Sequence, residues 1–224
     1  MSDENKDIYK IILVGETNVG KTCIITQFIE GKFEETHLAT ISHQFCRKNF
    51  DLPLERNITM DIWDTVGQER FRSLSNIYYK DAKAVILVYD ITNKGSFNEV
   101  KDYWYNQIKE NSNKDVIIAV AANKSDLYET REVSNEEGEE FAKSIDAIFA
   151  STSAKNDSGI TSLFENIAMK ILDSNVDINN NEQKTKEEYK SIKRGKKGGN
   201  ENNKHNTNTI AEQNSIKKNK KKCC

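Results

Sequence analysis

The sequence predicts an α/β fold: a three-layer, doubly wound and mostly parallel sheet with helices on both faces. Short apolar runs alternate with helical patterns from residue 8 to residue 172, and this alternation is typical of a parallel sheet covered by helices. Most of the runs are continuously apolar, as in strands that are buried on both faces.

The first half of the chain is expected to hold three strands and one helix. Residues 8–15 (IYKIILVG) form a nearly continuous apolar run and are expected to be the first strand. Residues 20–30 follow a glycine turn and carry a helical pattern. The apolar runs at 58–64 (ITMDIWD) and 84–90 (AVILVYD) predict the next two strands.

In the second half, helices and strands alternate regularly. Four apolar residues recur at spacings of three, four and four and predict one helix face: Phe97, Val100, Trp104 and Ile108. A strand is expected over 116–122, and a serine followed three residues later by a glutamate resembles a capping box for a helix over 135–144. A short strand over 147–151 and a helix with one apolar stripe over 160–172 complete the pattern.

Composition separates a folded body from a tail. We expect residues 1–7 to be disordered, 8–172 to form one domain and 173–224 to be disordered, because only nine of the last 52 residues are apolar. Residues 1–172 carry a net charge of −8 and the tail a net charge of +6. The acidic body excludes a general nucleic-acid binder, which needs clustered lysine and arginine.

Simple patterns exclude other classes of protein. No apolar stretch approaches the roughly 20 residues that span a bilayer, and the acidic start MSDENKD resembles neither a signal peptide nor a transit peptide. The cysteines form neither a disulfide framework nor a zinc pattern, which favours a reducing cytosol. They are Cys23, Cys46, Cys223 and Cys224.

A glycine-rich loop joins the first strand to the first helix. It reads G-x-x-x-x-G-K-T, the phosphate-binding loop or P-loop, between the strand and the helix that such a loop needs. Its glycines let backbone N–H groups converge on phosphate oxygens at a helix N-terminus. We expect Lys21 to reach the β and γ phosphates and the Thr22 hydroxyl to bind Mg²⁺. The loop residues expected to hold phosphate are Gly15, Glu16, Thr17, Asn18, Val19, Gly20, Lys21 and Thr22.

A second polar loop, DTVGQE, begins where the strand over 58–64 ends. An aspartate at the carboxyl end of this strand is expected beside the phosphate loop, so Asp64 can hold Mg²⁺ through a water. Gly67 can offer its N–H to a γ-phosphate, and Gln68 can orient an attacking water.

The third loop, Asn123-Lys124-Ser125-Asp126, follows the strand over 116–122. The Asp126 carboxylate can accept both N1–H and the N2 amino group of guanine, whereas adenine presents the wrong edge. Asn123 can reach N7, and the Lys124 stem can lie over the ring. After the last strand come Ser153, Ala154 and Lys155, which can offer a backbone N–H to the guanine O6. Together these loops favour GTP over ATP.

With these loops in this order, the chain resembles a Ras-superfamily small GTPase and is most similar to the Rab family. The resemblance covers residues 8–172 and is carried by WDTVGQERFRSL, YYKDA and LVYDIT. It implies a P-loop NTPase fold with a six-stranded sheet, and a slow, activator-dependent hydrolysis of GTP with Mg²⁺. It also implies a membrane switch of vesicle trafficking that recruits effectors in the GTP form.

The same resemblance implies roles for further residues. Thr40 would bind Mg²⁺ and sense the γ-phosphate, within a first switch over 34–45; a second switch would span 65–80. Lys21 and Gln68 would be the catalytic residues. Nucleotide contacts would also come from Cys23, Phe33, Thr40 and Leu127.

Effectors would meet an aromatic triad of Phe45, Trp63 and Tyr78, although Trp63 taken alone is better interpreted as core packing. Phe28 is expected in the core. Two positions depart from the family pattern: Ser42 stands where glycine is usual and Val66 where alanine is usual. Because a β-branched side chain is stiff, we hypothesise that Val66 slows switching or hydrolysis.

The tail ends in a lysine run followed by Cys223 and Cys224. This ending resembles the Rab signal for double geranylgeranylation, and two lipid chains anchor a protein stably where one does not. Each lysine adds up to about 1 kcal/mol of attraction to anionic lipid. The expected location is the cytosolic face of an intracellular membrane, with cycling to the cytosol. The expected partners are an exchange factor, a GTPase-activating protein, a prenyl-binding escort and effectors.

Two other functions stay open at this point. A P-loop kinase acting on a small metabolite would share the phosphate loop, but it would not need NKSD or a terminal cysteine pair. A scaffold that binds GTP without hydrolysing it would not need Gln68, whereas Val66 is compatible with it.

Overall fold

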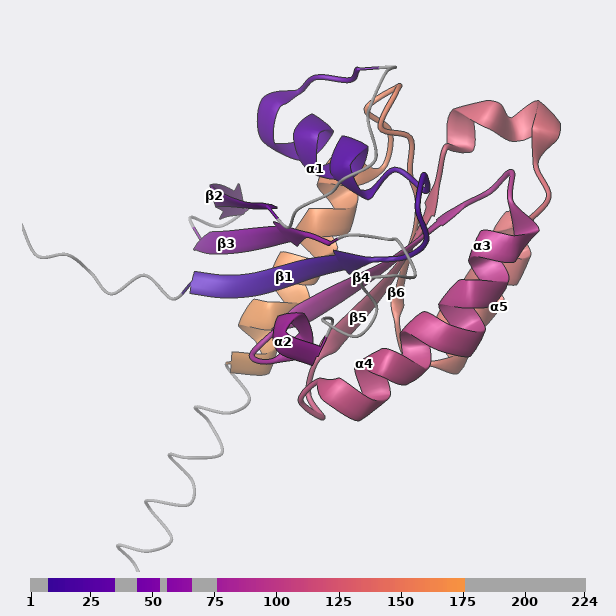
Figure 1. Cartoon of the computed structure of the whole chain (residues 1–224). Helices are drawn as coiled ribbons and strands as arrows, with labels where there is room; N and C mark the ends of the chain where they lie inside the picture. Colours follow the sequence, from indigo (N-terminus) through magenta and orange to yellow (C-terminus); the bar gives the residue numbers. More distant parts are fainter. Residues whose placement is uncertain (1–7, 35–43, 53–55, 66–75, 176–224) are drawn as a thin grey trace, which may run out of the picture. The chain divides into compact units, whose positions relative to one another are not determined.

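The computed structural model describes residues 8–34, 44–52, 56–65 and 76–175, and these form a helix-covered sheet (Figure 1). The six strands lie in the order β2-β3-β1-β4-β5-β6. β2 pairs with β3 antiparallel, and the other neighbouring strands pair in parallel. The predicted mostly parallel, six-stranded α/β fold is therefore confirmed.

The predicted strands fall close to the observed ones. The strands are β1 Ile8–Val14, β2 Gln44–Leu52, β3 Arg56–Asp64, β4 Ala84–Asp90, β5 Ile117–Asn123 and β6 Ile148–Ser151. The helical elements are α1 Lys21–Glu30, α2 Asn76–Tyr79, α3 Lys94–Glu99, η2 Val100–Trp104, α4 Tyr105–Asn111, η3 Ser125–Thr130 and α5 Asn135–Ser144. A last helix occupies residues 160–175.

The structure differs from the sequence-based prediction at β2, at the short helical elements α2 and η3, and at the end of the last helix. β2 was not expected as a strand, because this edge strand alternates exposed and half-buried residues over much of its length and has no apolar run. The last helix continues past residue 172 to residue 175, where the Asn175 side-chain amide donates to the Tyr9 hydroxyl at 2.7 Å. Residues 173–175 are therefore helical and not part of a disordered tail.

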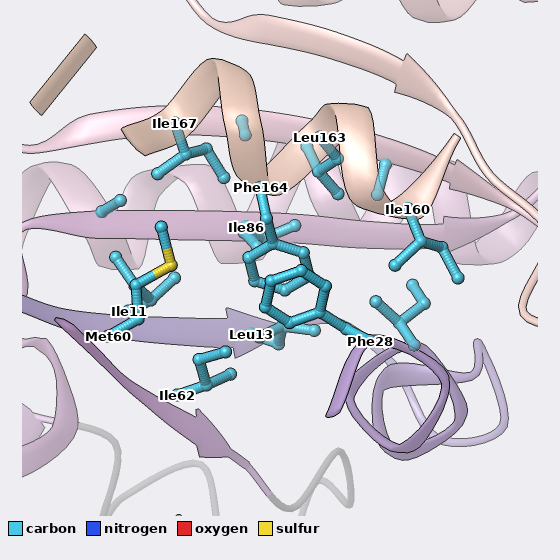
Figure 2. Close-up of a cluster of buried hydrophobic side chains, with 14 of the residues drawn as sticks. Ile11, Leu13, Phe28, Met60, Ile62, Ile86, Ile160, Leu163, Phe164 and Ile167 are labelled. Atoms are coloured by element: carbon cyan, nitrogen blue, oxygen red, sulfur yellow. The ribbon is translucent and has the colours of Figure 1, made fainter. Parts of the chain in front are cut away.

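The helices cover the two faces of the sheet and enclose two cores. On one face, α1 and the last helix pack on β1, β3 and β4, and Phe28 stacks on Phe164 with ring centroids 3.8 Å apart (Figure 2). On the other face, the continuous helical run α3-η2-α4 and helix α5 pack on the sheet. The four residues predicted as one helix face, Phe97, Val100, Trp104 and Ile108, are all buried there.

No helix among the described residues is long and apolar enough to cross a bilayer. The last four residues of β1, from Ile11 to Val14, and every residue of β4 are buried in the two cores. β1 ends at Val14, directly before the predicted phosphate loop, and β4 ends at Asp90.

Candidate functional site

Four predicted loops begin at the carboxyl ends of β1, β3, β5 and β6, which are parallel strands of one sheet. Leu13 pairs with Asp64 across β1 and β3, and Asp90 pairs with Asn123 across β4 and β5. In open α/β sheets, ligands bind at this end of the strands. The structure thus gathers the phosphate loop, Asp64 and the NKSD loop at one edge of the sheet.

The phosphate loop has a backbone that only particular residues allow. Gly15 has φ +147°, and a Cβ at this position would lie 2.2 Å from the carbonyl oxygen of Val88 in β4. Gly20 has φ +93°, and its Cβ would lie 2.4 Å from the Asn123 side-chain amide nitrogen. Both glycines therefore let the loop approach neighbouring strands closely. Asn18 is exposed, with φ +64°.

Lys21 folds back over the loop instead of pointing into solvent. It is 6% exposed, and its Nζ donates to the carbonyl oxygens of Gly15 at 2.9 Å and Glu16 at 2.8 Å. Burial lowers the pKa of the Lys21 ammonium to about 8, against the opposing pull of the Asp64 and Glu16 carboxylates. A buried cation beside a helix N-terminus suits a polyanionic ligand.

Oxygen donors suited to Mg²⁺ stand next to this lysine. The Thr22 hydroxyl donates to Asp64 Oδ2 at 2.6 Å, and Asp64 is 4% exposed. The neighbouring Thr65 hydroxyl donates to the Leu13 carbonyl at 2.5 Å, which fastens the end of β3 to β1. Hydroxyl and carboxylate oxygens are the hard ligands that Mg²⁺ takes, so these residues fit that ion. The described residues contain no cluster of three His, Cys, Asp or Glu side chains arranged for another metal site.

The NKSD loop is tied both to the phosphate loop and to the loop after β6. Asn123 is 1% exposed; its Nδ2 donates to the Val19 carbonyl at 2.8 Å, and its Oδ1 accepts from the Thr152 hydroxyl at 3.2 Å. The Ser153 hydroxyl donates to Asp126 Oδ1 at 2.5 Å. This serine therefore orients the carboxylate that the sequence assigns to guanine.

Lys124 makes a contact that sequence reasoning missed. Its Nζ lies 2.6 Å from Asp90 Oδ2, at the end of the neighbouring strand β4. The sequence placed Asp90 at the end of the strand over 84–90 and in the LVYDIT stretch, and predicted no role for it in the site. The sequence did contain an indication, since a carboxylate that ends a buried strand lies at the ligand-binding end of the sheet.

The predicted aromatic triad comes together on the β2–β3 side of the molecule. Phe45 and Trp63 stack with ring centroids 5.3 Å apart, and Trp63 and Tyr78 lie 6.2 Å apart. Phe45 is 54% exposed and Trp63 is half-buried. Trp63 also packs against the buried cluster on the α3–α5 face of the sheet, so both the core-packing interpretation and the effector role stay open for this residue.

The remaining predicted residues take varied positions. Val19 and Ala154 are buried in the core on the α1 side, whereas Leu127 and Lys155 are exposed. Glu16, Thr17, Cys23 and Phe33 are half-buried. Outside the described residues lie Thr40, Ser42, Val66, Gly67, Gln68, Cys223 and Cys224.

This arrangement defines a class of protein, an α/β nucleotide-binding protein of the P-loop type. Comparison with known proteins narrows it. Residues 10–173 match the Ras family. The Ras-related protein SEC4 of Saccharomyces cerevisiae is 37% identical over 172 residues, which are 77% of this chain and 78% of that protein.

The chain therefore belongs to the Ras family of small GTPases. Within the family it is Rab-like, a GTPase that works as a GTP/GDP switch in vesicle trafficking. The resemblance stated from the sequence is confirmed, and so is the predicted enzymatic class.

Proposed function

We propose that the switch operates through one Mg²⁺–guanine nucleotide site at the carboxyl ends of β1, β3 and β5. The observation that carries this proposal is the buried Lys21 ammonium, held over the loop by the Gly15 and Glu16 carbonyls, together with the hydrogen bond between Thr22 and Asp64 at the start of α1. The nucleotide phosphates would lie against the loop over 15–20 and the first turn of α1. Phe33 would flank the guanine ring, and Leu127 would also contact the nucleotide.

In hydrolysis, the chain's own groups would bind, orient and neutralise charge. Thr22, Thr40 and Asp64 would hold Mg²⁺, which supplies positive charge at the β and γ phosphates when bound. Lys21 would neutralise charge that develops on the γ-phosphate, and Gln68 would orient the attacking water. The motifs themselves supply no evident arginine finger, so we propose an activating protein that provides one, an addition typically worth about 10³–10⁵ in rate.

Guanine selection is proposed to rest on Asp126. Its carboxylate, oriented by Ser153, would accept two hydrogen bonds from guanine, and adenine would leave it unpaired. The test is competition between GDP and ADP for the purified chain. Wild type should prefer GDP strongly, and Asp126→Asn should lose most of that preference.

A matched control for this substitution is Asp157→Asn, which makes the same chemical change at an exposed position of the loop after β6. It should leave the preference unchanged. Equal binding of GDP and ADP by wild type would contradict the proposed site and favour a P-loop kinase. An unchanged preference in Asp126→Asn would remove Asp126 from base selection.

The tail is proposed to place the switch on the cytosolic face of an intracellular membrane. Prenylation of Cys223 and Cys224 would supply two lipid chains, and the lysines before them would favour anionic lipid. We further propose that an exchange factor and a prenyl-binding escort cycle the chain between membrane and cytosol, and that effectors bind at Phe45, Trp63 and Tyr78. A tagged chain with both cysteines changed to serine should lose its membrane location; retention would contradict the lipid anchor.

A further inference from the structure

We propose that Asp90 is a positioning residue that holds Lys124 beside the guanine base and thereby slows nucleotide release. This inference rests on the proposed function, because Lys124 belongs to the base-binding loop. Asp90 ends β4, and Lys124 follows the end of β5, the next strand in the sheet. Asp90 Oδ2 and Lys124 Nζ lie 2.6 Å apart, with side chains 11% and 32% exposed.

Asp90 is held in place by hydrogen bonds other than its ion pair with Lys124. Its Oδ1 accepts from the Thr92 backbone N–H at 2.9 Å and from the Thr92 hydroxyl at 2.8 Å. Its own backbone N–H donates to the Ser96 hydroxyl at 3.1 Å, and the next residue, Ile91, donates to the Asn123 carbonyl at 3.1 Å. These four bonds fix the carboxylate relative to both β5 and the start of α3.

Lys124 is the member of the pair that needs to be held. It has φ +63°, a left-handed conformation that is uncommon for residues other than glycine. Its long side chain is only partly buried and would otherwise sample many rotamers. An ion pair in which one carboxylate is nearly buried and hydrogen-bonded retains more strength than an exposed pair. The fixed carboxylate therefore sets where the lysine stem lies.

Asp90 could influence nucleotide release either as a negative charge near the phosphates or as a support for Lys124. These two explanations predict opposite changes in the release rate when the charge of Asp90 is removed. If the carboxylate acted only as a negative charge near a phosphate site, removing its charge would strengthen the binding of an anionic nucleotide. If it positions Lys124, removing its charge loosens the lysine and weakens binding. The direction of the change therefore separates the two explanations.

The experiment measures the rate at which GDP leaves the full chain after addition of excess competing GDP. Asp90→Asn keeps the shape and the Oδ1 acceptor for Thr92, and should release GDP roughly ten-fold faster, the size expected for loss of a charge-assisted contact. The matched control is Asp115→Asn. Asp115 pairs with Lys83 at 3.6 Å at the opposite end of the same two strands and is 71% exposed, so release should be unchanged.

A double-mutant cycle separates positioning from a general structural effect. In a Lys124→Met background, which retains the stem and removes the ammonium, Asp90→Asn should accelerate release no further. If Asp90→Asn does not fold, Thr92→Val loosens the same carboxylate through one lost hydrogen bond and should accelerate release by a smaller factor. The inference is overturned if GDP release is unchanged or slower in both Asp90→Asn and Thr92→Val. It is also overturned if Asp90→Asn accelerates release equally with and without the Lys124 ammonium. Failure of wild type to bind GDP at all overturns the proposed site as well.

Discussion

The replacement of Asn123 by alanine tests the hydrogen bonds that connect the NKSD loop to the phosphate loop and to the loop after β6. Asn123 is 1% exposed, and its amide bonds both the Val19 carbonyl, at 2.8 Å, and the Thr152 hydroxyl, at 3.2 Å. Each buried partner that is left without its hydrogen bond costs about 1–3 kcal/mol. Because water can enter the space left by the amide, we expect a total loss of about 2–4 kcal/mol.

Urea unfolding of the nucleotide-free chain measures this loss through the transition midpoint. Thr152→Val is the matched control, since it removes one of the two bonds and leaves the bond to Val19 in place; it should cost about half as much, about 1–2 kcal/mol. GDP affinity should fall in Asn123→Ala by more than in Thr152→Val. A loss in Asn123→Ala of less than about 1 kcal/mol, or no larger than in Thr152→Val, would refute the reasoning.

Three further predictions concern packing, titration and the second switch. Gly138→Ala should lower the urea midpoint, because the added Cβ would lie 2.4 Å from the Tyr89 hydroxyl and 2.6 Å from Phe149 Cε2. We expect the overpacking cost of about 1–3 kcal/mol to exceed the roughly 1 kcal/mol gained in helix propensity. An unchanged midpoint would contradict this prediction. Burial raises the pKa of the Tyr89 phenol above its ordinary value of 10, so the contribution of Tyr89 to stability is complete below pH 10 and is lost as the pH rises further. The free energy of unfolding of Tyr89→Phe should therefore fall less steeply above pH 10 than that of wild type, and equal slopes would count against this. Val66→Ala should cleave GTP faster in a single turnover, whereas equal rates would remove the stiffness hypothesis.

Buried strands were predictable because their burial is visible in the sequence itself. Every residue of β4 is buried, and AVILVYD is correspondingly apolar. β2 was not predictable in this way, since QFCRKNFDL mixes charged and apolar residues along an edge strand. Its strand conformation depends on pairing with β3, from Gln44 against Asp64 to Leu52 against Arg56. The helical residues 173–175 are likewise tied down by a distant contact, that of Asn175 with Tyr9.

In the candidate site, too, features set by neighbouring residues could be predicted, whereas contacts between distant parts of the chain could not. Loop motifs such as G-x-x-x-x-G-K-T and NKSD are local, so their residues can be identified from the order of amino acids alone. The contact between Asp90 and Lys124 depends on the register of β4 against β5, in which Asp90 lies opposite Asn123. Nothing in the spacing of residues 90 and 124 along the chain indicates it. The role of Thr152, which bonds Asn123 across β5 and β6, was hidden for the same reason.

The antiparallel pairing of β2 with β3 has a consequence for how the switch is read from outside. β2 begins and β3 ends at the same end of this two-stranded ribbon, because Gln44 lies opposite Asp64. Phe45 and Trp63 are the next pair in that register and stack on one another. A protein that bound these two rings would therefore contact the last residue of the first predicted switch, at residue 45, and the chain two residues before the start of the second, at residue 65.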